Sequence, residues 1–115
     1  MSVNYCTGEE LERPWGKWQV LDTGDRYAVK RLVIKPSHGI SLQVHMHRDE
    51  HWIVTSGKGL LTLRDQKQQI SANDHVFIAA GEYHQAINSG QENLVMVEIQ
   101  VGETLDETDI IRREP

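Results

Sequence analysis

The stretch that decides the fold reads ISLQVHMHRDEHWIVTSGKG and covers residues 40–59. Its first half alternates apolar with polar side chains, which is the period-two pattern of a β-strand. The residues Arg48 and Asp49 then form a turn signal, and a second apolar run follows it. We therefore predict two strands, over residues 40–47 and 51–56.

Side chains of the kinds that bind metals gather on one side of the first of these strands. Alternation predicts one face with Ser41, Gln43, His45 and His47 and an opposite dry face with Ile40, Leu42, Val44 and Met46. Glu50 and His51 follow the turn and can return to the same pocket. His84 opens a later strand directly after the turn glycine Gly81. Imidazole and carboxylate groups together form a recurrent site for divalent transition metals, so the sequence predicts a metal site.

The rest of the chain repeats short apolar or alternating segments between turn residues, and helical periodicity is almost absent. Further strands are predicted over residues 16–21, 27–35, 59–64, 67–70, 75–79, 84–88 and 94–101. This spacing is typical of an all-β antiparallel sandwich in a single domain, residues 1–115. We expect a core over about residues 27–101, an N-terminal arm over 1–26 and a charged tail over 102–115. The tail is predicted to run over the surface or to form one short helix.

Composition excludes several classes of protein. The 115 residues carry 12 Lys and Arg against 17 Asp and Glu, a net charge of −5, which argues against a nucleic-acid partner. No apolar run approaches the roughly 18 residues of a membrane-spanning helix, so we expect no membrane contact. The first residues do not resemble a signal peptide, so a cytoplasmic location is expected. Cys6 is the single cysteine and cannot form an intramolecular disulfide.

The spacing of these residues resembles the two motifs of the cupins, β-barrels with one metal ion. Glu50 precedes Gly57 by the family spacing, and the second motif keeps its spacing through Gly81, His84 and Asn88. Three turn positions differ in residue type: Ser37 and Asn73 stand where the motifs have glycine, and Ala79 stands where they have proline. The resemblance implies a jelly-roll, a double-stranded β-helix, with one divalent metal ion per subunit. It does not distinguish Zn, Co, Mn, Fe and Ni.

The ligand set keeps two alternatives. Counting back from Glu50 in the usual register gives Gln43, His45 and Glu50, with His84 from the second motif. Alternatively, His47 replaces Gln43 as a ligand, or it lies beside the metal as an acid–base or substrate-contacting group.

Four longer blocks resemble a narrower family. They read RPWGKWQVLD (13–22), VKRLVIKPS (29–37), SLQVHMHRDEHWIVTSGKG (41–59) and DIIRRE (109–114). They look like the cupin domain of type II phosphomannose isomerases, which usually forms the C-terminal part of bifunctional mannose-1-phosphate guanylyltransferase/mannose-6-phosphate isomerases. The resemblance covers about residues 12–113 and implies the isomerase half only, because 115 residues cannot also contain a nucleotidyltransferase domain.

Such an isomerase moves a proton between C2 and C1 of an open-chain sugar phosphate through an enediolate, so it needs a base and a phosphate anchor. The base candidates are His47, His51 and Glu98. The phosphate candidates are Lys30, Arg31 and Arg48. Lys30 and Arg31 are neighbours on one strand and point to opposite faces, so at most one enters the pocket; the resemblance favours Arg31 and Arg48. Trp52 is a candidate wall of the sugar site.

Two other functions are compatible with the same fold. One is a different metal-dependent activity, such as that of a dioxygenase. The other is a sugar-binding or sensor protein without catalysis. We also expect a homodimer, because the dry face with Leu42, Val44 and Met46 would lie outside the barrel if the ligands point inward.

Overall fold

The computed structural model describes residues 2–113, which form thirteen β-strands and no helix. The strands are β1 (Ser2–Val3), β2 (Glu10–Arg13), β3 (Gly16–Gly24), β4 (Tyr27–Ile34), β5 (Gln43–Val44), β6 (Asp49–Ser56), β7 (Lys58–Leu63), β8 (Gln66–Ser71), β9 (His75–Ile78), β10 (His84–Asn88), β11 (Leu94–Val101), β12 (Thr104–Leu105) and β13 (Ile111–Arg112). The predicted all-β class is therefore confirmed.

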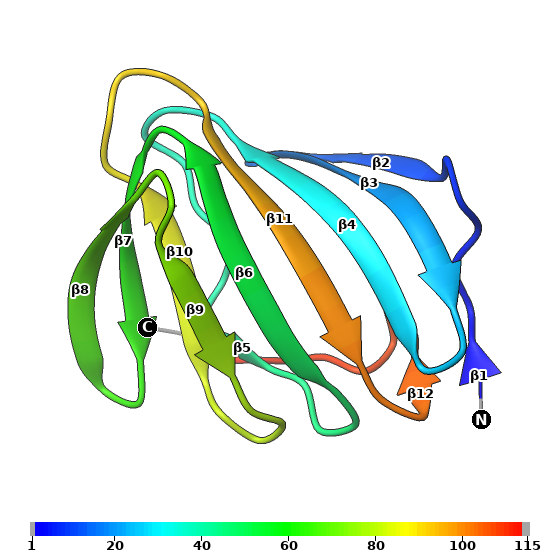
Figure 1. The fold of residues 1–115 in the computed structure, drawn as a ribbon. Coiled ribbons are helices and arrows are strands. Elements are labelled where there is room, and N and C mark those ends of the chain that lie inside the picture. The colour runs from blue at the N-terminus through cyan, green and yellow to red at the C-terminus, as the bar shows by residue number, and fades with distance from the viewer. Residues whose placement is uncertain (1, 114–115) are drawn as a thin grey trace.

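Two sheets face each other (Figure 1). One has six strands in the order β2-β3-β4-β11-β6-β9, and the other has five in the order β13-β5-β10-β7-β8. β1 and β12 form a separate parallel pair. The neighbours β4, β11 and β6 are far apart in sequence and antiparallel, so long crossovers between the sheets build the sandwich.

The core lies between the sheets in two clusters of buried apolar side chains. The larger consists of Ile34, Ile40, Trp52, Val54, Leu61, Ile70, Val76, Ile78, Ala86, Leu94 and Met96. The smaller consists of Tyr5, Trp18, Val20, Ala28, Leu32 and Leu105. Trp15 packs against both clusters. The smaller cluster draws on residues from both ends of the chain, so the arm and the tail belong to the packed structure.

The strand predicted over residues 40–47 is shorter than expected. Only β5 forms there, and it pairs with β10 at one position, Gln43 opposite His84. Alternation then fails: Val44 and His45 are consecutive and both buried, and Met46 and His47 are consecutive and both exposed. The cause is a turn, because the Asp109 carboxylate accepts hydrogen bonds from the backbone N–H groups of Met46 and His47, at 2.9 and 3.0 Å.

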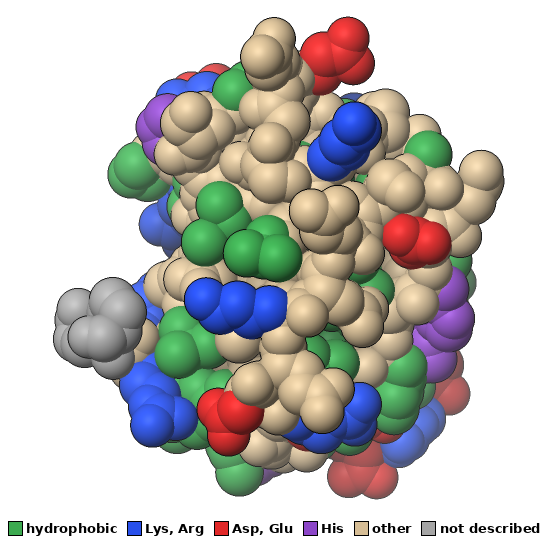
Figure 2. All heavy atoms as spheres, turned by 90° about the vertical axis from the view of Figure 1, so that its left-hand side faces the viewer, with side chains coloured by type: hydrophobic (Ala, Val, Ile, Leu, Met, Phe, Trp, Pro, Cys, Tyr) green, Lys and Arg blue, Asp and Glu red, His purple; other side chains and the backbone are tan. Residues whose placement is uncertain are grey.

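The predicted dry outer face is therefore wrong. Val44 is buried, Leu42 is half-buried and only Met46 is largely exposed, at 51%. Exposed apolar side chains lie instead on the outside of the six-stranded sheet, at Ile53, Phe77, Ile99 and Val101. The side of the molecule over β7 and β8, on the left of Figure 1, is mainly polar, with apolar side chains only in small groups (Figure 2).

The two ends of the chain are more structured than predicted. The arm supplies β1, β2 and β3, and the six-stranded sheet therefore begins before residue 27. The tail forms no helix over residues 102–113, and it supplies β12 and β13 instead. Residues 114–115 of the predicted tail lie outside the described part. Among residues 2–113, no helix is long and apolar enough to cross a membrane.

The substituted turn positions keep the backbone conformation that glycine favours. Ser37 has a φ of 65° and Asn73 a φ of 77°, both in the left-handed region. At these two positions Ser and Asn thus adopt a backbone conformation that glycine adopts readily.

Candidate metal centre

Three side chains of metal-binding type converge between the two sheets. Donor atoms of His45, Glu50 and His84 all lie within 4.8 Å of one another, and all three residues are buried. His45 follows β5, Glu50 lies in β6 and His84 begins β10. The pairing of β5 with β10 brings the two histidines together, with ring centroids 5.1 Å apart.

Backbone carbonyl groups orient both histidine rings. His45 Nδ1 lies 2.7 Å from the carbonyl oxygen of Asp109, and His84 Nδ1 lies 3.0 Å from that of Glu82. A carbonyl oxygen only accepts hydrogen bonds, so each Nδ1 must carry the proton. Each Nε2 therefore directs a lone pair at the cluster, as metal-binding histidines do.

Burial also keeps both rings neutral. Burial, together with the positive charge of the nearby Arg48, lowers the pKa of His45 to about 4. Burial likewise lowers the pKa of His84. Neutral imidazole is the form that binds a metal, so the two rings are ready for ligation near pH 7.

The residues fit a divalent metal ion. His84 Nε2 is buried and has no hydrogen-bond partner among the described residues, an orphaned acceptor that a metal would satisfy. It lies 3.9 Å from Glu50 Oε1, and His45 Nε2 lies 3.3 Å from Glu50 Oε2. The amide of Gln43 lies 3.4 Å from His45 Nε2 and offers an oxygen if it is turned over. A set of two nitrogens and one or two oxygens suits several transition metals and does not choose among them.

A network of buried polar groups surrounds the carboxylate of Glu50. Arg48 Nε donates to Glu50 Oε2 at 2.8 Å, and Trp52 Nε1 donates to Glu50 Oε1 at 3.0 Å. The same indole N–H lies 3.1 Å from Glu98 Oε2, and Gln100 Nε2 donates to Glu98 Oε1 at 2.7 Å. Trp52 thus links the two carboxyl groups.

The carboxyl group of Glu98 has a pKa close to neutral pH. Burial raises its pKa to about 7, and the negative charge of Glu50 contributes to the rise. A carboxyl group with such a pKa can both take up and release a proton under physiological conditions.

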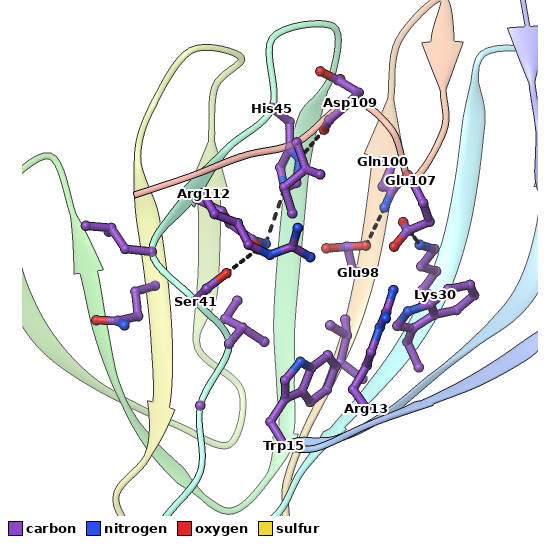
Figure 3. A pocket seen from close by; sticks show the side chains of 18 of the residues that line it. Arg13, Trp15, Lys30, Ser41, His45, Glu98, Gln100, Glu107, Asp109 and Arg112 are labelled. Carbon is purple, nitrogen blue, oxygen red and sulfur yellow. Dashed lines mark hydrogen bonds and ion pairs between the residues drawn. The ribbon is translucent and has the colours of Figure 1, made fainter. Parts of the chain in front are cut away.

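A cavity of about 530 Å³ opens onto this network (Figure 3). Both sheets, the arm and the tail line it, and His45, Arg48, Trp52, Glu98 and Gln100 are among its walls. The side chains of Trp15 and Trp18 also face it. It therefore combines aromatic surface with hydrogen-bonding groups, as sugar-binding pockets do.

The predicted site residues divide into two groups. The structure brings Gln43, His45, Glu50, His84, Arg48, Lys30, Trp52 and Glu98 to the metal centre or the cavity. It leaves His47, His51 and Arg31 outside both. His47 is exposed and lines a separate shallow depression together with Arg26 and Asp49.

The other two residues lie on the outer face of the six-stranded sheet. Arg31 donates to Gln19 at 2.6 Å, and the ring of His51 stacks on His75 with centroids 5.4 Å apart. Lys30, the neighbour of Arg31, points inward and is only 3% exposed. One of the two cations lines the cavity and the other does not, in agreement with the prediction that at most one enters.

Asp109 is a residue that motif spacing did not identify. Its carbonyl oxygen orients His45, and its carboxylate holds the turn at residues 46–47. Asp109 is the first residue of the block DIIRRE, which resembles the family, but the block did not indicate what Asp109 does. Gln100, whose Oε1 is buried without a hydrogen-bond donor among the described residues, was not singled out either.

Comparison with known proteins identifies the family of the chain. Residues 3–115 match the family model described as mannose-6-phosphate isomerase C-terminal. The chain is 42% identical over 111 residues to mannose-1-phosphate guanylyltransferase 2 of Escherichia coli O157:H7, a match that covers 96% of this chain and 23% of that protein. The chain thus spans about a quarter of the length of the curated relatives it matches.

Solved structures show the same fold. An uncharacterised conserved protein with a double-stranded β-helix domain from Klebsiella pneumoniae aligns with a TM-score of 0.74 at 22% identity, over 98% of this chain and 91% of that one. The capsular polysaccharide assembling protein CapF of Staphylococcus aureus aligns with a TM-score of 0.76 at 24% identity, over 93% of this chain and 32% of that one. The predicted double-stranded β-helix, the cupin fold, is confirmed, and the chain belongs to the family of the C-terminal domain of mannose-6-phosphate isomerase.

Proposed function

We propose that the chain is a metal-dependent aldose–ketose isomerase that interconverts mannose 6-phosphate and fructose 6-phosphate. One observation carries the proposal: a carboxyl group with a pKa of about 7, Glu98, lines the same cavity as His45, which belongs to the buried cluster with Glu50 and His84. The family match and the sugar-nucleotide enzymes among the relatives support the choice of substrate.

Glu98 is the proposed base. The reaction removes a proton from C2 of the open-chain aldose and returns it to C1, so one group must accept and then donate it. Of the three candidates His47, His51 and Glu98, only Glu98 lines the cavity. The donors Trp52 and Gln100 hold its two oxygens in place, and a fixed carboxyl group transfers protons within a defined geometry.

The metal would be held by His45, Glu50 and His84, with Gln43 as the candidate fourth ligand. When bound, a divalent ion supplies Lewis-acid stabilisation for the oxygens on C1 and C2, which become negatively charged in the enediolate. Arg48 orients Glu50 through its 2.8 Å hydrogen bond. Trp15 and Trp52 offer the apolar walls that exclude water from the sugar carbons.

Two expectations about the surroundings of the protein remain predictions. The homodimer was expected from an outer apolar face with Leu42, Val44 and Met46, which does not form. We propose instead that a second copy covers the exposed apolar side chains Ile53, Phe77, Ile99 and Val101. A cytoplasmic location is supported by the biosynthetic enzymes among the relatives.

The test is an isomerase assay on the purified chain. Mannose 6-phosphate is incubated with the protein as isolated, after chelation, and after addition of zinc, cobalt, manganese, iron or nickel, and fructose 6-phosphate is measured. Turnover that disappears on chelation and returns with metal is the expected result. No turnover with any metal would contradict the proposal and favour a binding protein or a different cupin activity.

A further inference from the structure

The cavity is cationic although the chain is acidic. Five Lys and Arg residues line it, against three Asp and Glu, while the whole chain has a net charge of −5. A concave surface of one sign concentrates its field, so the cavity attracts anions in spite of the distant acidic surface.

Three of the five cations already have partners. Lys30 Nζ lies 2.8 Å from Glu107 Oε2 and is packed between the rings of Tyr5 and Trp18, at 3.9 and 4.0 Å from their centroids. Arg48 is paired with Glu50. Arg113 lies over the ring of Tyr83, at 5.2 Å. The first two are neutralised by carboxylates, so they add little to an anion site.

Arg13 and Arg112 are different. Both line the cavity and are exposed to solvent, and within residues 2–113 neither has an acidic partner. Their backbones are fixed: Arg13 ends β2 opposite Gly16, and Arg112 lies in β13 opposite Gln43. Figure 3 shows them on either side of Glu98 in that view. Two guanidinium groups that line one cavity and have no carboxylate partner among residues 2–113 suit an oxyanion with two negative charges, since each can donate two hydrogen bonds.

A second, independent group in the cavity requires a ligand of another kind. Gln100 Oε1 is buried and accepts no hydrogen bond from any described residue, and the bond from its Nε2 to Glu98 fixes its orientation. A buried acceptor of this kind is satisfied by a donor such as a hydroxyl group. The cavity thus offers cations near its opening and an unused acceptor in its wall.

We propose that Arg13 and Arg112 bind the phosphate group of a phosphorylated polyol at the opening of the cavity, with a hydroxyl of its carbon chain donating to Gln100. The identity of the sugar rests on the proposed function. The phosphate site replaces Lys30, Arg31 and Arg48 as the anchor, because Arg31 lies on the outer face and the other two are already paired.

The test measures binding directly. The full chain is treated with a chelator so that no turnover occurs, and its affinities for mannose 6-phosphate, inorganic phosphate and mannose are determined by calorimetry. The variants are Arg13→Gln, Arg112→Gln and the double variant, and Arg31→Gln is the matched control. We expect each single variant to bind mannose 6-phosphate about tenfold more weakly and the double variant about a hundredfold more weakly. Affinity for mannose, and all affinities of the control, should not change.

Wild-type affinity for mannose 6-phosphate in the Arg13 and Arg112 variants would overturn the phosphate site. So would a wild-type protein that binds mannose 6-phosphate no more tightly than mannose. Circular dichroism checks that each variant folds. If a glutamine variant does not fold, Arg13→Lys or Arg112→Lys is used in its place. It should still bind less tightly than wild type because lysine lacks the planar fork.

The two proposals fail separately. Phosphate-dependent binding through Arg13 and Arg112 without any turnover would contradict the isomerase and keep the site. Turnover with an unchanged KM in both variants would support the isomerase and contradict the phosphate site.

Discussion

The two faces of the six-stranded sheet differ, around the candidate metal centre, in a way that departs from the usual distribution of side chains. Along β4, β6 and β11 the inward residues include Lys30, Glu50, Trp52, Glu98 and Gln100, all at most 4% exposed. Their outward neighbours include the apolar Ile53 and Ile99, which are 38% and 36% exposed. Most proteins bury apolar and expose charged side chains. Here the costly buried polar side chains are concentrated at the candidate metal centre and the adjoining cavity.

The inner face tolerates this cost because almost every polar atom is paired. Glu50 accepts from Arg48 and Trp52, and Glu98 accepts from Trp52 and Gln100. Removing one partner leaves another buried and unpaired, whereas the outer groups are in contact with water. The comparison therefore predicts large effects inside and small ones outside.

The largest expected effect comes from Glu50→Gln. It removes a metal ligand and leaves the buried guanidinium of Arg48 without its countercharge, so metal binding should be lost and the free energy of unfolding of the metal-free protein should fall by about 3 kcal/mol. Denaturant unfolding in the presence of chelator measures the second effect. The control is Arg64→Gln, which breaks the ion pair with Glu82 at a position 67% exposed, where a cost below about 1 kcal/mol is expected. Equal costs for the two variants would show that burial does not matter.

The second prediction concerns Glu98→Gln. The variant keeps the shape and the acceptor oxygen but cannot take up a proton, so kcat should fall by about 10²–10⁴-fold while metal content stays at the wild-type level. Steady-state kinetics and metal analysis measure the two quantities. Full activity in this variant would exclude Glu98 as the base, and the base would then have to be sought among other groups.

The same variant should change how stability depends on pH. The pKa of Glu98 in the folded protein is about 7, above its ordinary value of 4.5, so the folded state holds the proton more tightly than the unfolded state does. Wild-type stability from this group is present below pH 4.5 and is lost as the pH rises through 7. Glu98→Gln lacks this loss, so its stability relative to wild type should increase between pH 4.5 and pH 8, by up to about 3 kcal/mol.

Metal-free samples unfolded by denaturant across this range give the measurement. A stability difference that does not change with pH would contradict the raised pKa.

The smallest effect is expected on the outer face. His51→Ala removes a half-exposed ring that stacks on His75, so the free energy of unfolding should change by less than about 0.5 kcal/mol and kcat not at all. Thermal unfolding and the isomerase assay check both. A large loss of activity would mean that this face also takes part in the reaction.

Much of the fold could be predicted because its signal is local. The strands predicted over 27–35, 51–56, 59–64, 84–88 and 94–101 overlap β4, β6, β7, β10 and β11, which have clear apolar periodicity and turn residues at their ends. β2, β12 and β13 carry no such pattern. They form by pairing with strands already in place, so their own residues contain little information about them.

The residue types of the metal centre could be predicted from the sequence, but their arrangement in space could be predicted only in part. His45, Glu50 and His84 follow from ligand chemistry and spacing, and the structure brings them together. His47 shares the expected face with His45 but lies outside, since the strand ends before it. Arg13 and Arg112 come from the two ends of the chain, and nothing in either segment indicates that they meet at one cavity.

The sequence by itself determined that the chain is an all-β domain with paired histidines and a carboxylate at ligand spacing, because strand periodicity and residue chemistry are properties of neighbouring residues. Only the tertiary structure decided which side of each strand faces inward and where alternation stops. Period-two alternation separates Lys30 from Arg31 without saying which is inside; packing between the two sheets selects Lys30. The turn that exposes His47 depends on Asp109, 62 residues away, and a contact across such a distance has no trace in local pattern.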